Sequence, residues 1–291
     1  MKKYASDAVL LLTATIWGIA FVAQRKGMES IDPMLFNGIR FTLGAIIVGL
    51  IALKANRKTA KIPFPWLLGI TLTIASSFQQ IGMVWTTAGN AGFITGLYIV
   101  FVPIIGIFRK QIISKTIWLA IVLAVIGLYL INVKQDINVS MGNLFVLVSA
   151  VFFAWHVQLV DKYTRMYDTL SLAFAQASFV AISSLLIGLI YHFYLKPDFL
   201  FTHEIYQSIG KAGIPLLYGG LFSAGIAYTL QVSAQKKVAP SAAAIILCLE
   251  SVFALLGGWI LLKEKITLTI LLGAALLFTA MLFSIRSRFT N

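Results

Sequence analysis

Two ionisable side chains lie inside stretches of the sequence that are otherwise apolar. Glu250 is the tenth residue of the 22-residue stretch 241–262, and Arg40 lies within 33–53. A charge at the centre of a membrane span costs about 2.5–3.5 kcal/mol on insertion scales, so it usually faces a cavity or a partner. These two side chains are therefore the first candidates for chemistry.

Glu250 lies near the middle of its stretch, where so short a side chain cannot reach water. Burial in a medium of low dielectric constant favours the neutral form of a carboxyl group until water or a cation reaches it. A group that gains and loses a proton at this depth is what coupling to protons requires. We predict a coupling role for Glu250; the alternative is a neutral carboxyl group that hydrogen-bonds a neighbouring helix.

Arg40 lies seven residues after Pro33, and Asn37 precedes Arg40 by three residues. On a helix this spacing places the two side chains on one face. Because a guanidinium binds a carboxylate with two parallel hydrogen bonds, the pair predicts a contact with an anionic part of a substrate. The alternative is a structural arginine that extends outward or bonds the carbonyls of a helix end.

Other side chains in the apolar stretches extend this predicted substrate-binding set. The polar candidates are Gln79, Gln80, His156, Gln158, Gln176 and Gln231, and the aromatic candidates are Trp17, Tyr98 and Trp155. The aromatic rings could form a wall for an amphiphilic substrate or a face for a cation. Hydrogen bonds between helices would equally explain the amides, and ordinary helix packing would explain the rings.

The composition excludes an ordinary soluble protein. Hydrophobic residues make up 59% of the 291 residues and charged residues 11%, whereas soluble domains are about half apolar and about a quarter charged. The net charge of +13 comes from short basic runs between apolar blocks, which predicts contact with anionic membrane lipids and not with nucleic acid. The single cysteine, Cys248, excludes an intrachain disulfide and a cysteine-based zinc site.

The sequence lacks the motifs of the common catalytic and cofactor sites. It contains no HExxH, GxSxG, GxGxxG or P-loop pattern and no cluster of Cys and His. We therefore predict no enzyme activity, no metal and no cofactor. Without a P-loop the chain cannot by itself be an ATP-driven pump.

Ten stretches are long and apolar enough to cross the hydrocarbon core of a bilayer. The predicted spans are 8–24, 33–53, the two halves of 62–108, 116–133, 137–160, 169–195, 212–235, 241–262 and 266–285. The small polar residues of 86–90 divide the stretch 62–108. The sequence thus predicts an all-α integral membrane protein with ten transmembrane helices.

The distribution of Lys and Arg among the loops predicts the orientation in the membrane. With a cytoplasmic N-terminus, fifteen of the 23 basic residues lie on the inner side and seven on the outer side, and Arg40 is in a span. Basic residues favour the cytoplasmic side. We therefore predict a multi-pass protein of the plasma membrane or the bacterial inner membrane with both termini in the cytoplasm.

The sequence also contains a weak internal repeat. Residues 11–42 align without gaps with 147–178, so that Arg40 falls opposite Gln176. We predict a first repeat over 1–135 and a second over 136–291, each with five helices. An odd number of helices inverts the second copy, and inverted repeats are typical of secondary transporters.

Several motifs of the chain resemble one known family. Thr15-Ile16-Trp17-Gly18, Arg40, Leu249-Glu250-Ser251 and Gly273 together look like the EamA-type family of the drug/metabolite transporter superfamily. The resemblance covers the whole chain as two consecutive family domains. It implies two bundles of five helices, a central cavity lined mainly by helices one to four and six to nine, and transport of small metabolites, commonly as efflux. The family usually has proline after this glutamate, whereas Ser251 stands here.

These observations predict a secondary active transporter that works by alternating access and is coupled to protons. The expected activity is export of amino acids or similar amphiphilic compounds. Two alternatives remain open: an importer of a vitamin or a nucleoside-like solute, and a membrane sensor or assembly factor that moves no solute. The expected partners are a small-molecule substrate and membrane lipids, and both a monomer and a homodimer are compatible with the sequence.

Overall fold

The computed structural model describes residues 4–54, 65–132, 140–195, 203–262 and 267–290, and in these ranges it contains helices and no strands. The elements, in chain order, are α1 (Ala5–Gly27), α2 (Pro33–Lys54), α3 (Trp66–Gly82), α4 (Ala88–Gly96), α5 (Tyr98–Phe108), α6 (Lys115–Asn132), α7 (Met141–Thr164), α8 (Thr169–Leu195), α9 (His203–Lys211), α10 (Gly213–Leu217), the π-helix η3 (Tyr218–Ala227), α11 (Tyr228–Gln235), α12 (Pro240–Leu247), α13 (Glu250–Leu262) and α14 (Leu268–Thr290).

The helices have the length and apolarity that a membrane requires. In the described ranges, eight helical segments qualify as spans, and α6 supplies a shorter apolar helix. Large apolar side chains cover the outer surface, among them Leu53, Phe108 and Phe193, which are 75%, 83% and 64% exposed. Because such a surface is stable only against lipid, the prediction of a helical, multi-pass membrane protein is confirmed.

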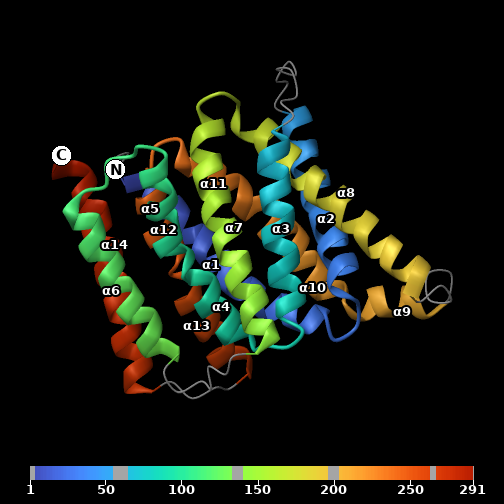
Figure 1. The fold of residues 1–291 in the computed structure, drawn as a ribbon. Coiled ribbons are helices and arrows are strands. Elements are labelled where there is room, and N and C mark those ends of the chain that lie inside the picture. Colours follow the sequence, from blue (N-terminus) through green and yellow to red (C-terminus); the bar gives the residue numbers. More distant parts are fainter. Residues whose placement is uncertain (1–3, 55–64, 133–139, 196–202, 263–266, 291) are drawn as a thin grey trace.

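The helices form one bundle in which elements far apart in the sequence lie side by side (Figure 1). The helix α2 packs along α8, α3 along α7, and α6 along α14. In the last pair, a Cβ atom built on Gly127 would come within 2.7 Å of the Gly273 carbonyl oxygen. Glycine at both positions therefore allows the two backbones to touch, as is common where membrane helices associate.

Two of the membrane helices are interrupted near their middle. The first break separates α4 from α5 at Leu97, where the Leu97 N–H donates to Ile94 and the Val100 N–H donates to Leu97. The second break separates α12 from α13 just before Glu250. At both sites the local bonds join residues three apart, so the chain makes one tight turn and then resumes the helix.

A third helix is widened and not broken. Between α10 and α11 the segment η3 forms a π-helix of ten residues. Long π-helical segments are rare, and shorter ones often mark functional sites. Gly220 and Gly225 in this segment lie against Leu43 and Gly44 of α2, so the widened helix fits closely to its neighbour.

The structure corrects three of the predicted spans in detail. The stretches 212–235 and 241–262 are not continuous α-helices, and the fourth span is divided at Leu97. The predicted turn at 86–90 lies slightly earlier, because Thr87 caps α4 by accepting a hydrogen bond from the Asn90 N–H at 3.1 Å. Sequence periodicity does not detect such breaks, since the apolar composition continues through them.

Candidate functional site

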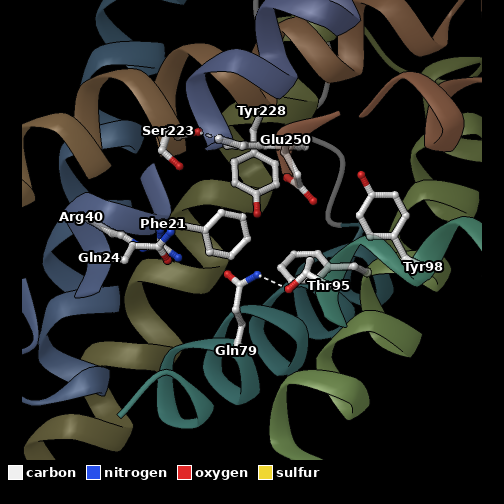
Figure 2. Close-up of a pocket in the computed structure, with 11 residues that line it drawn as sticks. Phe21, Gln24, Arg40, Gln79, Thr95, Tyr98, Ser223, Tyr228 and Glu250 are labelled. Carbon is white, nitrogen blue, oxygen red and sulfur yellow. Dashed lines mark hydrogen bonds between the residues drawn. The ribbon is translucent and has the colours of Figure 1, made fainter. Parts of the chain in front are cut away.

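A cavity lies at the centre of the bundle, where the broken and widened helices meet (Figure 2). The centre of a water-sized sphere can reach about 40 Å³ of this cavity, enough space for a few water molecules. Six helices before η3 contribute to its lining, namely α1 to α5 and α7, and so do η3, α11 and α13. The lining residues are Trp17, Phe21, Gln24, Arg40, Gln79, Thr95, Tyr98, Phe153, Ser223, Tyr228 and Glu250.

Aromatic rings form one side of the cavity. The Trp17 and Tyr228 ring centroids are 4.8 Å apart at an interplanar angle of 59°, a favourable tilted arrangement. The Trp17 Nε1–H donates to the Ser223 carbonyl oxygen at 3.4 Å, which joins α1 to the π-helix. Gly18 brings α1 against α13, because a Cβ atom there would lie 2.6 Å from the Glu250 carbonyl oxygen. The motif around Trp17 therefore positions the cavity wall.

Arg40 supplies the positive charge of the cavity. Its side chain is 3% exposed, and its Nε–H donates to the Asn37 Oδ1 at 3.0 Å. The Asn37 amide nitrogen in turn donates to the Ser76 and Ser184 hydroxyls at 3.1 and 2.9 Å. Asn37 therefore lies outside the cavity lining and holds the guanidinium from behind. In the described part of the chain, no carboxylate forms an ion pair with Arg40.

Glu250 supplies the negative charge of the same cavity. It is the first residue of α13, it is 3% exposed, and its Oε1 has no hydrogen-bond partner among the described residues. Tyr98 is the first residue of α5, and its hydroxyl group interacts with the Glu250 carboxyl group. Both side chains line the cavity (Figure 2). Each helix break thus presents one polar group to the space between the helices.

Uncharged polar groups complete the lining. The Gln79 Nε2 donates to the Thr95 Oγ1 at 3.1 Å, which connects α3 with α4. The Gln24 Nε2 donates to the Ala20 carbonyl oxygen at 3.2 Å, and the Gln24 Oε1 is buried without a partner in the described residues. The cavity therefore offers hydrogen-bonding groups beside its two opposite charges.

The remaining predicted amides lie away from the cavity lining. The Gln176 Oε1 is 2.9 Å from the His156 Nε2, and the His156 ring meets the Tyr228 ring edge-on, with centroids 6.0 Å apart. Gln80 and Gln231 are buried, with amide atoms that have no partner in the described ranges. His156 and these three glutamines surround the cavity and are not part of its lining.

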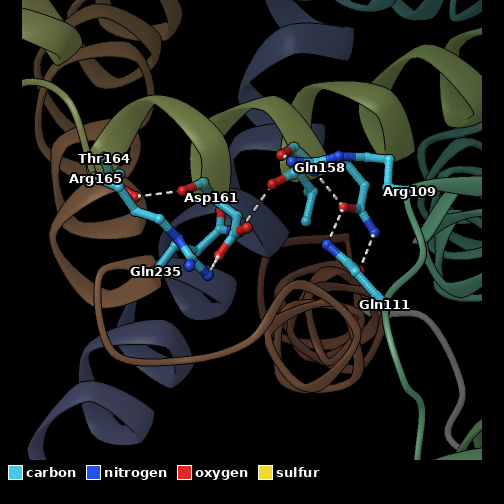
Figure 3. Close-up of polar contacts among 8 residues, drawn as sticks. Arg109, Gln111, Gln158, Asp161, Thr164, Arg165 and Gln235 are labelled. Carbon is cyan, nitrogen blue, oxygen red and sulfur yellow. Dashed lines mark hydrogen bonds and ion pairs between the residues drawn. The ribbon is translucent and has the colours of Figure 1, made fainter. Parts of the chain in front are cut away.

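Gln158 belongs to a separate network at the end of the bundle where α1 begins and α14 ends (Figure 3). Its Oε1 accepts hydrogen bonds from the Arg109 Nη1 at 2.6 Å and from the Gln111 Nε2 at 2.9 Å. Its Nε2 donates to the Val102 carbonyl oxygen at 2.8 Å. Because these bonds satisfy both ends of the amide, the structure assigns Gln158 to the joint between α5 and α7 and not to the cavity.

The expected aromatic pair of Trp17 and Trp155 does not form. Trp155 is 42% exposed on the outer surface and stacks on Phe152, with ring centroids 6.5 Å apart. Phe153 takes the place expected of Trp155 in the cavity. Side chains two positions apart on an α-helix point in directions about 200° apart. Trp155 therefore faces away from the cavity when Phe153 faces into it. The ungapped repeat alignment pairs Trp17 with Phe153, and that signal could have identified it.

The sequence analysis missed six lining residues: Phe21, Gln24, Thr95, Phe153, Ser223 and Tyr228. Tyr228 is the most central of them, since it contacts the rings of Trp17, Phe41 and His156. One signal was available for Tyr228, because it precedes Gln231 by three residues in an uncharged stretch. No comparable signal marks Ser223, whose position depends on the π-helix.

A charged cavity enclosed at the centre of apolar membrane helices defines a class of protein: a polytopic membrane protein with a polar solute site. Within the described ranges, no group of three or more His, Cys, Asp or Glu side chains could hold a metal ion. The cavity lining combines two ionisable side chains with amides, hydroxyl groups and aromatic rings.

Comparison with known proteins gives the family. The model of the EamA-like transporter family matches residues 5–133 and again residues 140–286. The chain belongs to the EamA-like transporter family, and the predicted resemblance is confirmed. Both matches together cover most of the chain, so the family accounts for its membrane helices and for a role in transport.

Individual relatives are also named as transporters. An uncharacterized transporter of Archaeoglobus fulgidus is 29% identical over 283 residues, which cover 97% of this chain and 86% of the relative. A probable amino-acid metabolite efflux pump of Escherichia coli is 23% identical over 292 residues, covering 96% and 94%. A solved crystal structure with 14% identity has a TM-score of 0.76 over 96% of this chain and 98% of that one, which shows the same fold. The chain is thus similar to transporters of small metabolites.

Proposed function

We propose that this protein is a secondary active transporter that exports amino acids or similar small amphiphilic compounds. The observation that carries the proposal is the pair of opposite charges in one cavity. Arg40 and Glu250 both line it, both are 3% exposed, and neither has an ion-pair partner among the described residues. A buried charge without a partner is costly, and a bound solute that carries the complementary charge removes that cost.

A zwitterion fits this arrangement. Its carboxylate would bind the Arg40 guanidinium, whose planar fork suits a carboxylate. Its ammonium group would lie toward Glu250 and the faces of the aromatic rings, where cation–π attraction adds to the charge interaction. The rings of Trp17 and Tyr228 leave an apolar surface for the side chain of the substrate. This match of groups favours an amino acid over a nucleoside-like solute, which lacks both charges.

Alternating access follows from the predicted inverted repeat of five plus five helices, with repeats over 1–135 and 136–291. The packing supports this proposal, because it is reciprocal: α2 packs on α8, and α6 on α14, as a twofold axis in the membrane would require. The break between α4 and α5 likewise has a counterpart between α12 and α13. Two similar halves that rock about a central site would expose it first to one side of the membrane and then to the other.

The proposed orientation places both termini in the cytoplasm. The beginning of α1 and the end of α14 lie at the same end of the bundle (Figure 1). Arg109 and Arg165 lie at that end in the polar network of Figure 3. The excess of basic residues there favours its position on the cytoplasmic side.

Protons would drive the export through Glu250. In the cavity its carboxyl group would be protonated when the site is dry and would release the proton when water or a substrate ammonium group enters. The position of the carboxyl group supports this role, because water or a substrate that enters the cavity reaches Oε1, which has no hydrogen-bond partner among the described residues. Proton uptake on one side and release on the other would link substrate movement to the proton gradient.

Counterflow in liposomes tests the proposal. Vesicles that contain the purified protein and millimolar unlabelled L-phenylalanine are diluted into a trace of radiolabelled L-phenylalanine, and the assay is repeated with other apolar amino acids and with a nucleoside. We expect transient accumulation of labelled amino acid, absent from vesicles without protein. A sensor or assembly factor would give no accumulation with any solute. Accumulation of the nucleoside alone would favour the alternative importer, and efflux from preloaded cells would then decide the direction.

A further inference from the structure

Three buried glutamines and one histidine line the junction of α7, α8 and α11. Gln176 lies on α8, Gln231 and Gln235 lie on α11, and His156 lies on α7. All four side chains are at most 2% exposed. We call this group the amide seam. None of its members lines the central cavity, and none belongs to the Gln158 network.

Each glutamine of the amide seam has one amide atom without a partner in the described part of the chain. These atoms are the Gln176 Nε2, the Gln231 Oε1 and the Gln235 Oε1. A buried amide atom that makes no hydrogen bond is strongly unfavourable, and native proteins usually satisfy it with ordered water. Three such atoms in one junction therefore point to a common occupant that both donates and accepts hydrogen bonds.

The amide seam begins at the central cavity. The His156 ring lies edge-on to the ring of Tyr228, which lines the cavity. Gln231 follows Tyr228 by three residues and Gln235 by seven, so the three side chains form one face of α11. The Gln235 Nε2 donates to the Val157 carbonyl oxygen of α7 at 3.0 Å, which shows that this face is turned toward α7.

The amide seam ends at a second opening. One helical turn beyond Val157, Asp161 lines a cleft of about 390 Å³ between α7, α12 and the loop that follows α5. Arg165 also lines this cleft, and Gln235 lies near Asp161 (Figure 3), at the end of the bundle where α1 begins. The seam is thus a polar strip between the cleft and the cavity, while the side chain of Val232 on the next face of α11 is packed in an apolar cluster.

We propose that the amide seam holds a file of ordered water molecules that carries protons between this terminal cleft and the central cavity. The inference rests on the proposed proton coupling at Glu250. Water fits because neither opening extends through the seam, so a solute as large as an amino acid has no room there. In each transfer one O–H bond breaks at a hydronium in the cleft, protons pass along the water file, and one O–H bond forms at the Glu250 carboxylate.

Apolar substitution of the amides tests the water file. Gln231→Leu and Gln235→Leu, alone and together, remove the unpartnered atoms while keeping the size of the side chain, so folding should survive. In proteoliposomes, pH-gradient-driven uptake of L-phenylalanine by the double variant should be about tenfold slower than by the wild type. The reason is that the hydrogen bonds along the proton path are not made. Its L-phenylalanine exchange at equal pH should stay near the wild-type rate. Gln207→Leu, the same change on the exposed face of α9, is the matched control.

Radiolytic labelling provides a measurement that does not depend on transport. X-ray-generated hydroxyl radicals form at ordered water and modify adjacent side chains, so His156 should be labelled in the wild type and protected in the double variant, while Tyr228, which lines the central cavity, should be labelled in both. The water file would be overturned if His156 is not labelled in the wild type. It would also be overturned if the ratio of gradient-driven uptake to exchange is the same in the double variant and the wild type. Absence of exchange for every amino acid tested would instead reject the proposed function, and the labelling would still decide whether the seam holds water.

Discussion

The two broken helices have the same geometry and carry different chemistry. Tyr98 begins α5 after the first break, and Glu250 begins α13 after the second. Each side chain lines the central cavity with a polar oxygen. The first helix contains Pro103 six residues after Leu97, whereas α13 contains no proline after the second break. The two breaks therefore share a shape, while only the second presents a carboxyl group to the cavity.

Other positions that the repeat alignment pairs also differ in chemistry. Trp17 and Phe153 both line the cavity, so their shared role is an aromatic surface. Arg40 lines it too, whereas its counterpart Gln176 contacts His156 outside. The paired positions thus differ in chemistry, and the cavity has Arg40 on one element and Glu250 on another. The following experiments remove one difference between the halves at a time.

The largest effect is expected for Glu250→Gln, which removes the ionisable group and leaves two uncharged polar groups at the breaks. The amide imitates a permanently protonated carboxyl group, so it should abolish pH-gradient-driven accumulation. Binding of L-phenylalanine and exchange at equal pH should persist, because neither requires a change of protonation. Uptake in proteoliposomes with and without an imposed pH gradient measures both properties.

Tyr98→Phe is the companion variant at the other break, since it removes the hydroxyl group that interacts with Glu250 and keeps both the ring and the carboxyl group. Gradient-driven accumulation should remain in this variant, because the ionisable group is still present. Full accumulation by a folded Glu250→Gln protein would show that Glu250 is only a structural group, and loss of accumulation in both variants would show that coupling needs the Tyr98 hydroxyl group as well as the carboxyl group.

A smaller effect is expected at Arg40, where Arg40→Gln makes α2 resemble α8 at the aligned position. Loss of the charged contact should raise the concentration for half-maximal L-phenylalanine uptake by about tenfold. Arg40→Lys keeps the charge but loses the planar fork, so its half-maximal concentration should lie between those of Arg40→Gln and the wild type. Saturation curves for exchange at equal pH distinguish the three proteins. Unchanged curves for both variants would leave Arg40 no part in substrate binding.

The sequence was sufficient to identify the membrane helices and the charges of the site. Glu250 and Arg40 were recognisable because a charge stands out in an apolar stretch, and both line the cavity. The face that α7 turns toward the cavity was not recognisable, because Phe153 and Trp155 are equally plausible wall residues when only the sequence is known. The break before Glu250 was equally hidden, since Cys248 and Leu249 carry no helix-breaking signal. Ten spans and the inverted repeat stay predictions that the packing supports.

The close contact between α1 and the second break predicts an effect on stability. A Cβ atom on Gly18 would lie 2.5 Å from the Phe253 Cβ and 2.8 Å from the Ala254 backbone nitrogen. Neither atom belongs to the end of a flexible side chain, so Gly18→Ala should force the helices apart and lower the free energy of unfolding by about 1–3 kcal/mol. The melting temperature of the detergent-purified protein measures this loss.

Gly257→Ala provides the matched control on the same pair of helices. Its Cβ atom would lie 3.6 Å from the Val22 Cγ2, which is an ordinary contact. Alanine is also the better helix former by about 1 kcal/mol, so this variant should melt at or slightly above the wild-type temperature. Equal destabilisation by both variants would contradict the tight contact at Gly18.

The smallest effect is expected where Ser251 replaces the usual proline of the family. The Ser251 Oγ donates to the Gly92 carbonyl oxygen at 2.9 Å, and its N–H donates to the Cys248 carbonyl oxygen at 3.2 Å. Ser251→Ala loses the first bond and should cost about 0.5–1.5 kcal/mol. Ser251→Pro loses both bonds, but a proline in the first turn of a helix removes an N–H that the helix itself does not need.

Ser251→Pro should therefore melt within a few degrees of Ser251→Ala and retain gradient-driven uptake, because the break before Glu250 already exists. Leu255→Pro is the control in the interior of the same helix, where proline costs about 3 kcal/mol or more by removing a bond of the helix and by clashing with its preceding turn. If Ser251→Pro were as damaging as Leu255→Pro, α13 could not begin at Glu250. The two breaks would then differ in geometry as well as in chemistry, and the proposed correspondence between Tyr98 and Glu250 would be lost.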